Sequence, residues 1–424
     1  MTKQLAGWDL ATWRVSQSDS SKVANIVSVV EISGVISREL LLTRIKKTLE
    51  YFPILRMGVF ENNGIHLEEL PEINFRDAFT VSTDTLGEII HRLSKKQVGT
   101  GDCLWEIVLV QQLDKSFLIG AIHHAIADGN SAMAIMNSLF DGYQPVHFSF
   151  EEPFEKSEND FFENLKTTTG TLISRLVSDP AGLAEDATAM LKSATRLLIS
   201  NAENLNRNSS SNFVHQFFKI EKMQLKKVAS PLHVSVHDVI TAISVLAFIE
   251  YTKVKNISKE SVIVNVPVAM NLNDAVANKL IVARIDVPTK FESIPELIYG
   301  CRDSLKKWRQ EPALSLASGF VEIANQLPLK VITDNLNKSD LTVSSLAGTS
   351  QTLRLAGYEI NAVWPVMSPV GAAINFTSLL MNNHLHLGIT IDRAAIEDLE
   401  LWQASWSWAS KTVLGLEIFE QIFE

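Results

Sequence analysis

The sequence predicts an α/β protein of two domains joined by a helical crossover. Its 424 residues exceed what one hydrophobic core usually organises. In both halves, short apolar runs typical of buried strands alternate with amphipathic helices. Between the halves, residues 153–206 are rich in polar helix formers, and residues 201–212 are rich in Asn and Ser, as in an exposed linker. The expected units are an N-terminal domain, a crossover with linker, and a C-terminal domain, over residues 1–150, 151–210 and 211–424.

Each element of the N-terminal half follows from its pattern. Residues 26–32 form an apolar run that predicts a strand, and residues 38–51 carry leucine and isoleucine on one helical face. Residues 104–110 and 117–122 predict neighbouring strands joined by a short polar turn. Residues 130–140 predict a helix, because a capping residue precedes them.

The C-terminal half resumes the same alternation. Residues 239–249 predict an apolar helix, and residues 262–268 predict a buried strand. Residues 374–380 and 385–391 flank an Asn-Asn pair, which predicts a hairpin. We expect any functional site at the junction of the two domains.

Composition and charge exclude several classes of protein. A net charge of −10 argues against nucleic-acid binding, which needs a basic surface. Cys103 and Cys301 give no disulfide framework, so we expect reduced, buried thiols and a cytoplasmic location. The first residues lack the layout of a signal peptide, and the longest apolar run, residues 239–249, is too short to span a membrane. A peripheral contact with a membrane or a lipid droplet stays open.

Residues 121–129, AIHHAIADG, place unusual polarity between a predicted strand and a predicted helix. In an extended segment neighbouring side chains point to opposite faces, so only one of His123 and His124 can face a given cavity. The pair is therefore a poor metal site, and we expect one imidazole to act as a general base while the other packs. Asp128 is expected to orient the loop or cap the helix, and Gly129 to permit a backbone conformation denied to other residues. No serine or cysteine nucleophile lies beside the motif, which favours direct attack by an acceptor.

This motif, HHxxxDG, resembles the signature of a superfamily of acyltransferases that includes chloramphenicol acetyltransferase and condensation domains. Further segments resemble the bacterial wax ester synthase/diacylglycerol acyltransferase (WS/DGAT) family within it. They are Phe52-Pro53-Ile54-Leu55-Arg56, Leu104-Trp105-Glu106 after Cys103 in place of proline, Val264-Asn265-Val266-Pro267-Val268, Ala277-Asn278-Lys279, Ser344-Ser345, Leu355-Ala356-Gly357, Trp364-Pro365-Val366, Ile374-Asn375 and residues 387–392. The resemblance covers nearly the whole chain and is weakest across residues 150–210.

The resemblance implies two chloramphenicol-acetyltransferase-like domains, each a mixed sheet flanked by helices, with a channel between them. It implies that His124 is the general base of the HHxxxDG site, which also contains His123, Asp128 and Gly129. Asp128 would be a structural residue that pairs with an arginine, and Arg56 is the candidate by position. The acyl donor would be acyl-CoA, and the acceptor a fatty alcohol or a diacylglycerol. The residues assigned to substrate binding are Trp105, His237, Asn271 and Asn375.

Two positions depart from the family pattern and bear on the acceptor. The family usually carries Asn-Asp where this chain has His237-Asp238, and an arginine where it has Met270-Asn271. An acyl carrier protein as donor, with an alcohol or amine acceptor, is therefore kept as an alternative, as is a non-catalytic lipid-binding relative. No metal or other cofactor is expected, because the valines between His233 and His237 disfavour a helical metal pair. We expect a monomer, since two similar halves in one chain can complete a site.

Overall fold

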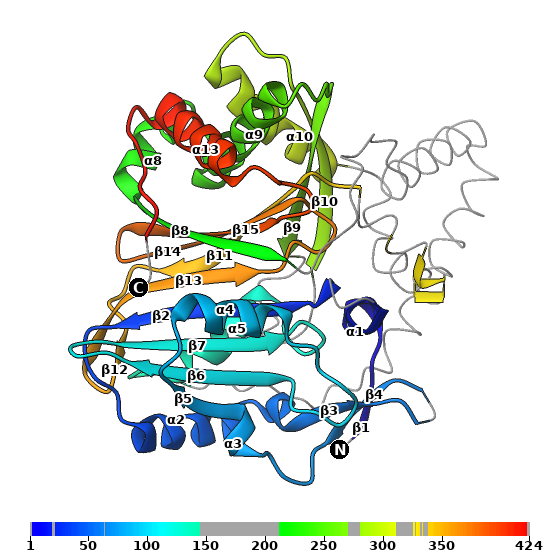
Figure 1. The fold of residues 1–424 in the computed structure, drawn as a ribbon, viewed down its shortest axis with the longest axis vertical. Coiled ribbons are helices and arrows are strands. Elements are labelled where there is room, and N and C mark those ends of the chain that lie inside the picture. Colours follow the sequence, from blue (N-terminus) through cyan, green and yellow to red (C-terminus); the bar gives the residue numbers. More distant parts are fainter. Residues whose placement is uncertain are drawn as a thin grey trace, which may run out of the picture.

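The computed structural model describes residues 2–18, 22–62, 64–144, 212–269, 280–310 and 338–421, together with residues 325–326, 328–330 and 333. In these residues, two six-stranded mixed sheets lie one above the other, and a three-stranded sheet lies at the edge of the N-terminal half (Figure 1). The predicted crossover over residues 151–210 lies outside the described residues.

The N-terminal sheet is antiparallel except where β5 runs parallel to β6. Its strands, in spatial order, are β12 (Arg354–Leu355), β13 (Tyr358–Met367), β2 (Asn25–Ile32), β7 (Ser116–His123), β6 (Trp105–Gln111) and β5 (Phe79–Ser82). The small sheet contains β1 (Thr2–Gln4), β4 (His66–Glu69) and β3 (Met57–Phe60). The helices of this half are α1 (Gly7–Ser18), α2 (Arg38–Tyr51), the 3-10 helix η2 (Pro53–Arg56), α3 (Phe75–Ala78), α4 (Leu86–Lys95) and α5 (Gly129–Asn137).

The C-terminal sheet is covered on one face by helices (Figure 1). Its strands, in spatial order, are β10 (Leu280–Pro288), β9 (Ser261–Ala269), β11 (Leu341–Thr349), β14 (Ile374–Met381), β15 (His384–Asp392) and β8 (Phe213–Glu221). The helices are α8 (Lys222–Ala229), α9 (Val236–Val254), α10 (Ile294–Arg309) and α13 (Leu399–Leu414). Helix α9 is apolar on almost all its faces, and it is accordingly buried at the centre of this layer.

Local signals explain where these elements begin. Ser37 caps α2 by accepting a hydrogen bond from Leu40 N, and Ser235 with Asp238 forms a capping box at the start of α9. The predicted hairpin is β14–β15, where Asn382 and Asn383 have φ angles of 49° and 61°. Asparagine tolerates this left-handed backbone better than most residues, which explains the Asn-Asn pair.

The two sheets do not follow the boundary between the two predicted domains. β13 belongs to the C-terminal half of the sequence, yet it pairs with β2 in the N-terminal sheet, with Trp364 opposite Val29. Asp141, just beyond α5, holds the turn before β13 by accepting hydrogen bonds from Ala356 N at 3.1 Å and Gly357 N at 2.7 Å. The expected C-terminal domain therefore contributes residues 354–367 to the sheet of its neighbour.

The two sheets also meet through buried aromatic rings. Trp364 on β13 lies edge-on to the ring of His386 on β15, with centroids 5.4 Å apart. Neither buried ring nitrogen of His386 has a hydrogen-bond partner in the part of the chain that the structure describes. Burial lowers the pKa of His386 to about 3, Lys219 and His384 lower it further, and the Met381 carbonyl opposes this shift. His386 is thus a polar group that the fold buries at a cost.

A buried ion pair holds the strands at the centre of the C-terminal sheet. Lys259 Nζ lies 2.5 Å from Asp340 Oδ1, and the two side chains are only 8% and 2% exposed. The other carboxylate oxygen accepts a hydrogen bond from Ile263 N at 2.9 Å. Asp340 therefore connects the loop before β11 to β9.

No helix among the described residues is both long and apolar enough to cross a membrane.

Replacement of Asp340 by alanine is expected to lower the free energy of unfolding by about 3–5 kcal/mol, because the Lys259 charge stays buried without this partner. The matched control is Glu250→Gln, which removes the exposed pair with Lys253 at 3.8 Å and should cost less than about 1 kcal/mol. Urea unfolding of both variants measures the difference. Equal losses in the two variants would contradict the role given to Asp340.

Acid is expected to destabilise the protein through its buried histidines. The pKa values of His123, His215 and His386 are lowered by burial to about 3, whereas an exposed histidine titrates near ~6.5. The unfolded chain takes up protons first, so each histidine removes up to about 1.4 kcal/mol of stability per pH unit as the pH falls below ~6.5. His386→Phe keeps an aromatic ring beside Trp364. It should reduce the loss of unfolding free energy by up to about 1.4 kcal/mol per pH unit, the contribution of one histidine. Urea unfolding between about pH 4 and 6.5 tests this, and an unchanged slope would contradict it.

Candidate active site

The HHxxxDG loop connects β7 to α5 and is held by backbone hydrogen bonds from both sides. His123 N donates to Leu104 O at 2.8 Å, and His124 N donates to Ala24 O at 2.8 Å. Ala24 directly precedes β2, and Leu104 directly precedes β6, which are the two strands that flank β7. The histidines therefore stand at the end of a central strand, fixed by both of its neighbours.

His123 uses both of its ring nitrogens within the protein. Nδ1 accepts a hydrogen bond from Ala125 N at 3.1 Å, so Nε2 carries the proton and donates to Ser16 Oγ at 3.0 Å. The side chain is 1% exposed and lies edge-on to Trp13 of α1. Burial, and secondarily the neighbouring His124, lower its pKa to about 3. His123 is therefore the histidine that packs.

His124 follows the last residue of β7 and occupies the turn before α5. Its side chain retains 9% exposure, against 1% for His123. The two side chains thus differ in exposure, and His124 lies in the turn rather than in the extended strand.

Asp128 is the N-terminal cap of α5. Its Oδ1 accepts a hydrogen bond from Ser131 N at 2.8 Å, and its backbone is extended, as a cap requires. The expected pairing with Arg56 is wrong. Arg56 ends η2 next to β4 and forms an ion pair with Glu69 at 3.1 Å, with both side chains near half exposed. The Asp128 carboxylate instead satisfies the helix terminus.

At Gly129 a side chain of the C-terminal sheet limits the space, and the backbone angles are ordinary. It is the first residue of α5, and a Cβ atom there would lie 2.5 Å from Leu346 Cδ2 on β11. The expectation that Gly129 adopts a conformation denied to other residues is not met, because its φ lies outside the left-handed range. This close approach brings the motif against a strand of the C-terminal sheet.

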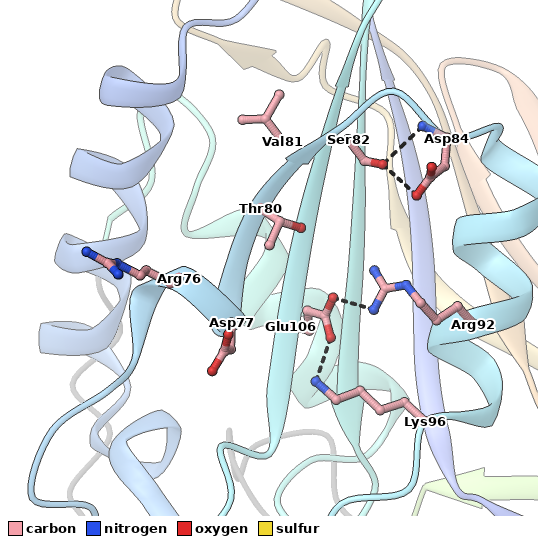
Figure 2. A pocket seen from close by; sticks show the side chains of 9 residues that line it. All are labelled: Arg76, Asp77, Thr80, Val81, Ser82, Asp84, Arg92, Lys96 and Glu106. Carbon is pink, nitrogen blue, oxygen red and sulfur yellow. Dashed lines mark hydrogen bonds and ion pairs between the residues drawn. The ribbon is translucent and has the colours of Figure 1, made fainter.

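The Leu104-Trp105-Glu106 segment connects the motif to the N-terminal core and to α4. Leu104 accepts the bond from His123 N, and the Trp105 indole donates to Leu55 O at 2.8 Å from within the N-terminal core. The Glu106 carboxylate, 4% exposed, binds Arg92 at 2.7 Å and Lys96 at 2.6 Å, both at the end of α4 (Figure 2). Trp105, which the resemblance assigns to substrate binding, is 5% exposed and is packed in the N-terminal core.

A surface cavity of about 390 Å³ opens over this charged cluster (Figure 2). Side chains of α3, β5, α4 and β6 line it, and cationic and anionic groups are equal in number. The lining residues are Arg76, Asp77, Thr80, Val81, Ser82, Asp84, Arg92, Lys96 and Glu106. None of the sequence-predicted site residues is among them, so this cavity is separate from the histidine loop.

The remaining predicted residues lie on the C-terminal sheet and its helices. His237, in the first turn of α9, has Nδ1 2.9 Å from Ser345 Oγ on β11. Asn375 on β14 is buried and accepts a hydrogen bond from Thr377 Oγ1 at 2.7 Å. Asn271 lies outside the described residues. Among the described residues, no group of three or more His, Cys, Asp or Glu side chains is placed to hold a metal ion.

Sequence reasoning did not single out Ser345 as a site residue. Leu346, the next residue, touches the start of α5. Strand β11 therefore contacts the motif through Leu346 and contacts His237 through Ser345. The signal available in the sequence was the Ser344-Ser345 pair, but its long-range partners cannot be read from spacing.

Comparison with known proteins identifies the class. Residues 276–403 match the family model of the WS/DGAT C-terminal domain. The fold is similar to that of wax ester synthase/diacylglycerol acyltransferase from Marinobacter aquaeolei VT8, with a TM-score of 0.63, 14% identity, and coverage of 97% of this chain and 100% of that one. No curated protein matches the chain.

Condensation domains share the fold as well. The starter condensation domain of rhizomide synthetase, a double mutant in complex with C8-CoA, matches with a TM-score of 0.64 and 11% identity over 99% of this chain and 98% of that one. The first condensation domain of the calcium-dependent antibiotic synthetase, in complex with a substrate analogue, matches with a TM-score of 0.65 and 12% identity over 98% and 97%. The domain match indicates an acyltransferase, and the resemblance to the WS/DGAT family is confirmed.

If Asp128 acts as a helix cap, Asp128→Asn should keep most of the stability, because asparagine caps helices about as well as aspartate. Asp128→Ala should lose about 1 kcal/mol, since Ser131 N then lacks its acceptor. Thermal and urea unfolding of the two variants measure the contrast. An Asp128→Asn protein as destabilised as Asp128→Ala would show that the charge, rather than the cap, matters.

Proposed function

We propose that the protein transfers an acyl group from acyl-CoA to the hydroxyl group of a hydrophobic alcohol or a diacylglycerol, with His124 as the general base. The observation that carries this proposal is the engagement of both His123 nitrogens with Ser16 and Ala125. With His123 held by these partners, we propose that His124, which is 9% exposed against 1% for His123, is the imidazole of the motif that exchanges a proton with a substrate. The WS/DGAT domain match over residues 276–403 supports the ester-forming class.

In this mechanism His124 takes the proton of the acceptor hydroxyl as that oxygen attacks the thioester carbonyl carbon. The tetrahedral intermediate collapses, the carbon–sulfur bond breaks, and an ester forms. The leaving thiolate takes up the proton from the His124 imidazolium, which regenerates the base. No covalent enzyme intermediate is needed. The protein's own contribution is the rigid placement of His124 by Ala24, while Asp128 and Gly129 fix the start of α5.

The choice of CoA as the donor is supported by the similar rhizomide synthetase domain, which is in complex with C8-CoA. Its identity as a condensation domain equally favours the second candidate, transfer from a carrier-protein thioester to an alcohol or an amine. The third candidate is a non-catalytic lipid-binding relative. The three candidate functions predict different release of free thiol from a given thioester donor.

Purified protein is expected to release free thiol from acetyl-, octanoyl- or palmitoyl-CoA only when a long-chain alcohol is present. His124→Ala should reduce this release by at least about 100-fold, as is usual for loss of a general base. His233→Asn is the matched control, because His233 is an exposed histidine with a left-handed backbone that asparagine tolerates.

Near wild-type turnover of a folded His124→Ala protein would contradict the role of His124. Silence of the wild type with all three CoA esters would shift the proposal to a carrier-protein donor. Silence with a carrier-protein donor as well would favour the non-catalytic relative.

A further inference from the structure

A chain of hydrogen bonds runs from α9 through two strands of the C-terminal sheet. His237 Nδ1 lies 2.9 Å from Ser345 Oγ on β11, and Ser345 Oγ lies 2.9 Å from Ser378 Oγ on β14. Ser378 Oγ lies 3.2 Å from the carbonyl oxygen of Ser344. Ser345 and Ser378 are opposite each other in the parallel pairing of β11 with β14, so they share one face of the sheet.

The direction of this chain follows from counting hydrogens. Each serine has one hydroxyl hydrogen, and a carbonyl oxygen can only accept. If Ser378 donates to Ser344 O, then Ser345 donates to Ser378, and His237 Nδ1–H donates to Ser345, which makes three bonds. The reverse direction makes only two and leaves the Ser344 carbonyl without the buried Ser378 hydroxyl. The first direction is favoured because it makes one more hydrogen bond.

In the favoured direction the Nε2 atom of neutral His237 carries a lone pair. Burial lowers the pKa of His237, and so does Arg309, while Asp238 raises it. The ring is therefore neutral at neutral pH. Nε2 has no hydrogen-bond partner among the described residues, and it is not enclosed in the core. The protein thus presents a fixed hydrogen-bond acceptor at the start of α9.

This acceptor lies beside a break in the C-terminal sheet. The pairing of β9 with β11 ends at Thr342, and from Val343 onward no described strand pairs with the edge of β11 that faces β9. Ser345, which is exposed, lies on this stretch, and so does Leu346, which touches Gly129 of the motif. A substrate that passes along this edge can meet both the histidine loop and His237.

We infer that Ser345 and Ser378 fix His237 as a specificity-determining residue, whose Nε2 accepts a hydrogen bond from an O–H or N–H group of a substrate. Two groups of the reaction offer this chemistry: a second hydroxyl on the acyl acceptor and an amide N–H of the pantetheine arm. This inference rests on the proposed function for the identity of the substrate. The tautomer of His237 and its response to ligands are independent of that function.

The direct test is NMR of the full chain labelled with ¹⁵N-histidine, with His237→Phe used to assign the His237 signals. At neutral pH the wild type should show a protonated Nδ1 and an unprotonated Nε2. Ser345→Ala should lose this preference, and Ser345→Thr, which keeps the hydroxyl, should retain it. A protonated Nε2 in the wild type would overturn the inference.

The same sample identifies the source of the donor group. The probes are octan-1-ol, octane-1,2-diol and coenzyme A, each added separately. A shift of the Nε2 signal with the diol but not with the mono-alcohol assigns the second hydroxyl, whereas a shift with coenzyme A assigns the pantetheine amide. Absence of a shift with every probe would overturn the inference.

Kinetics separates this inference from the proposed function. With an active wild type, Ser345→Ala should raise the KM for the substrate identified by NMR about three- to tenfold, the usual effect of one hydrogen bond, and Ser345→Thr should restore it. Unchanged KM values for both substrates in Ser345→Ala would overturn the inference alone. An inactive wild type would instead contradict the proposed function, and the NMR result would still decide the role of His237.

Discussion

The pairing of β13 with β2 is the constraint on which the arrangement of the two halves depends. A strand from the C-terminal half completes the N-terminal sheet, and Asp141 fixes the turn that leads into it. Strand β11 of the C-terminal sheet also lies against the start of α5, where Leu346 fills the space that a side chain at Gly129 would occupy. The histidine loop therefore depends on both halves. Separate folding of the two predicted domains would leave the N-terminal sheet without β12 and β13, and the motif without its contact to Leu346.

Several residues in and beside the motif hold the histidine loop in place. His123 binds Ser16, Asp128 caps α5, and the Leu104 carbonyl accepts a bond from the strand end. Glu106 anchors the same segment to α4 through Arg92 and Lys96. This preorganisation matters for acyl transfer because a base acts efficiently only when its position is fixed before the substrate arrives.

Much of this arrangement can be predicted from the sequence alone, because local patterns specify it. The hydrophobic periodicity predicts α2 at residues 38–51 and gives six of the strands to within a residue, and the asparagine pair predicts the β14–β15 hairpin. The alternation of side chains predicts that one of the two histidines packs. Spacing does not reveal long-range pairing, so the placement of β13, the ion pair of Arg56 with Glu69 and the bond of His237 to Ser345 require the structure. The reason for Gly129 is likewise a contact with a residue more than 200 positions away.

The central claim is that His124 is the base and His123 is structural, and chemical rescue by imidazole tests it most directly. Each histidine is replaced by glycine, and acyl transfer is measured as free imidazole is added to the folded variants. The account predicts that imidazole restores transfer in His124→Gly and not in His123→Gly, whose defect is one of packing. Rescue confined to His123→Gly, or full activity of His124→Gly without imidazole, would contradict it.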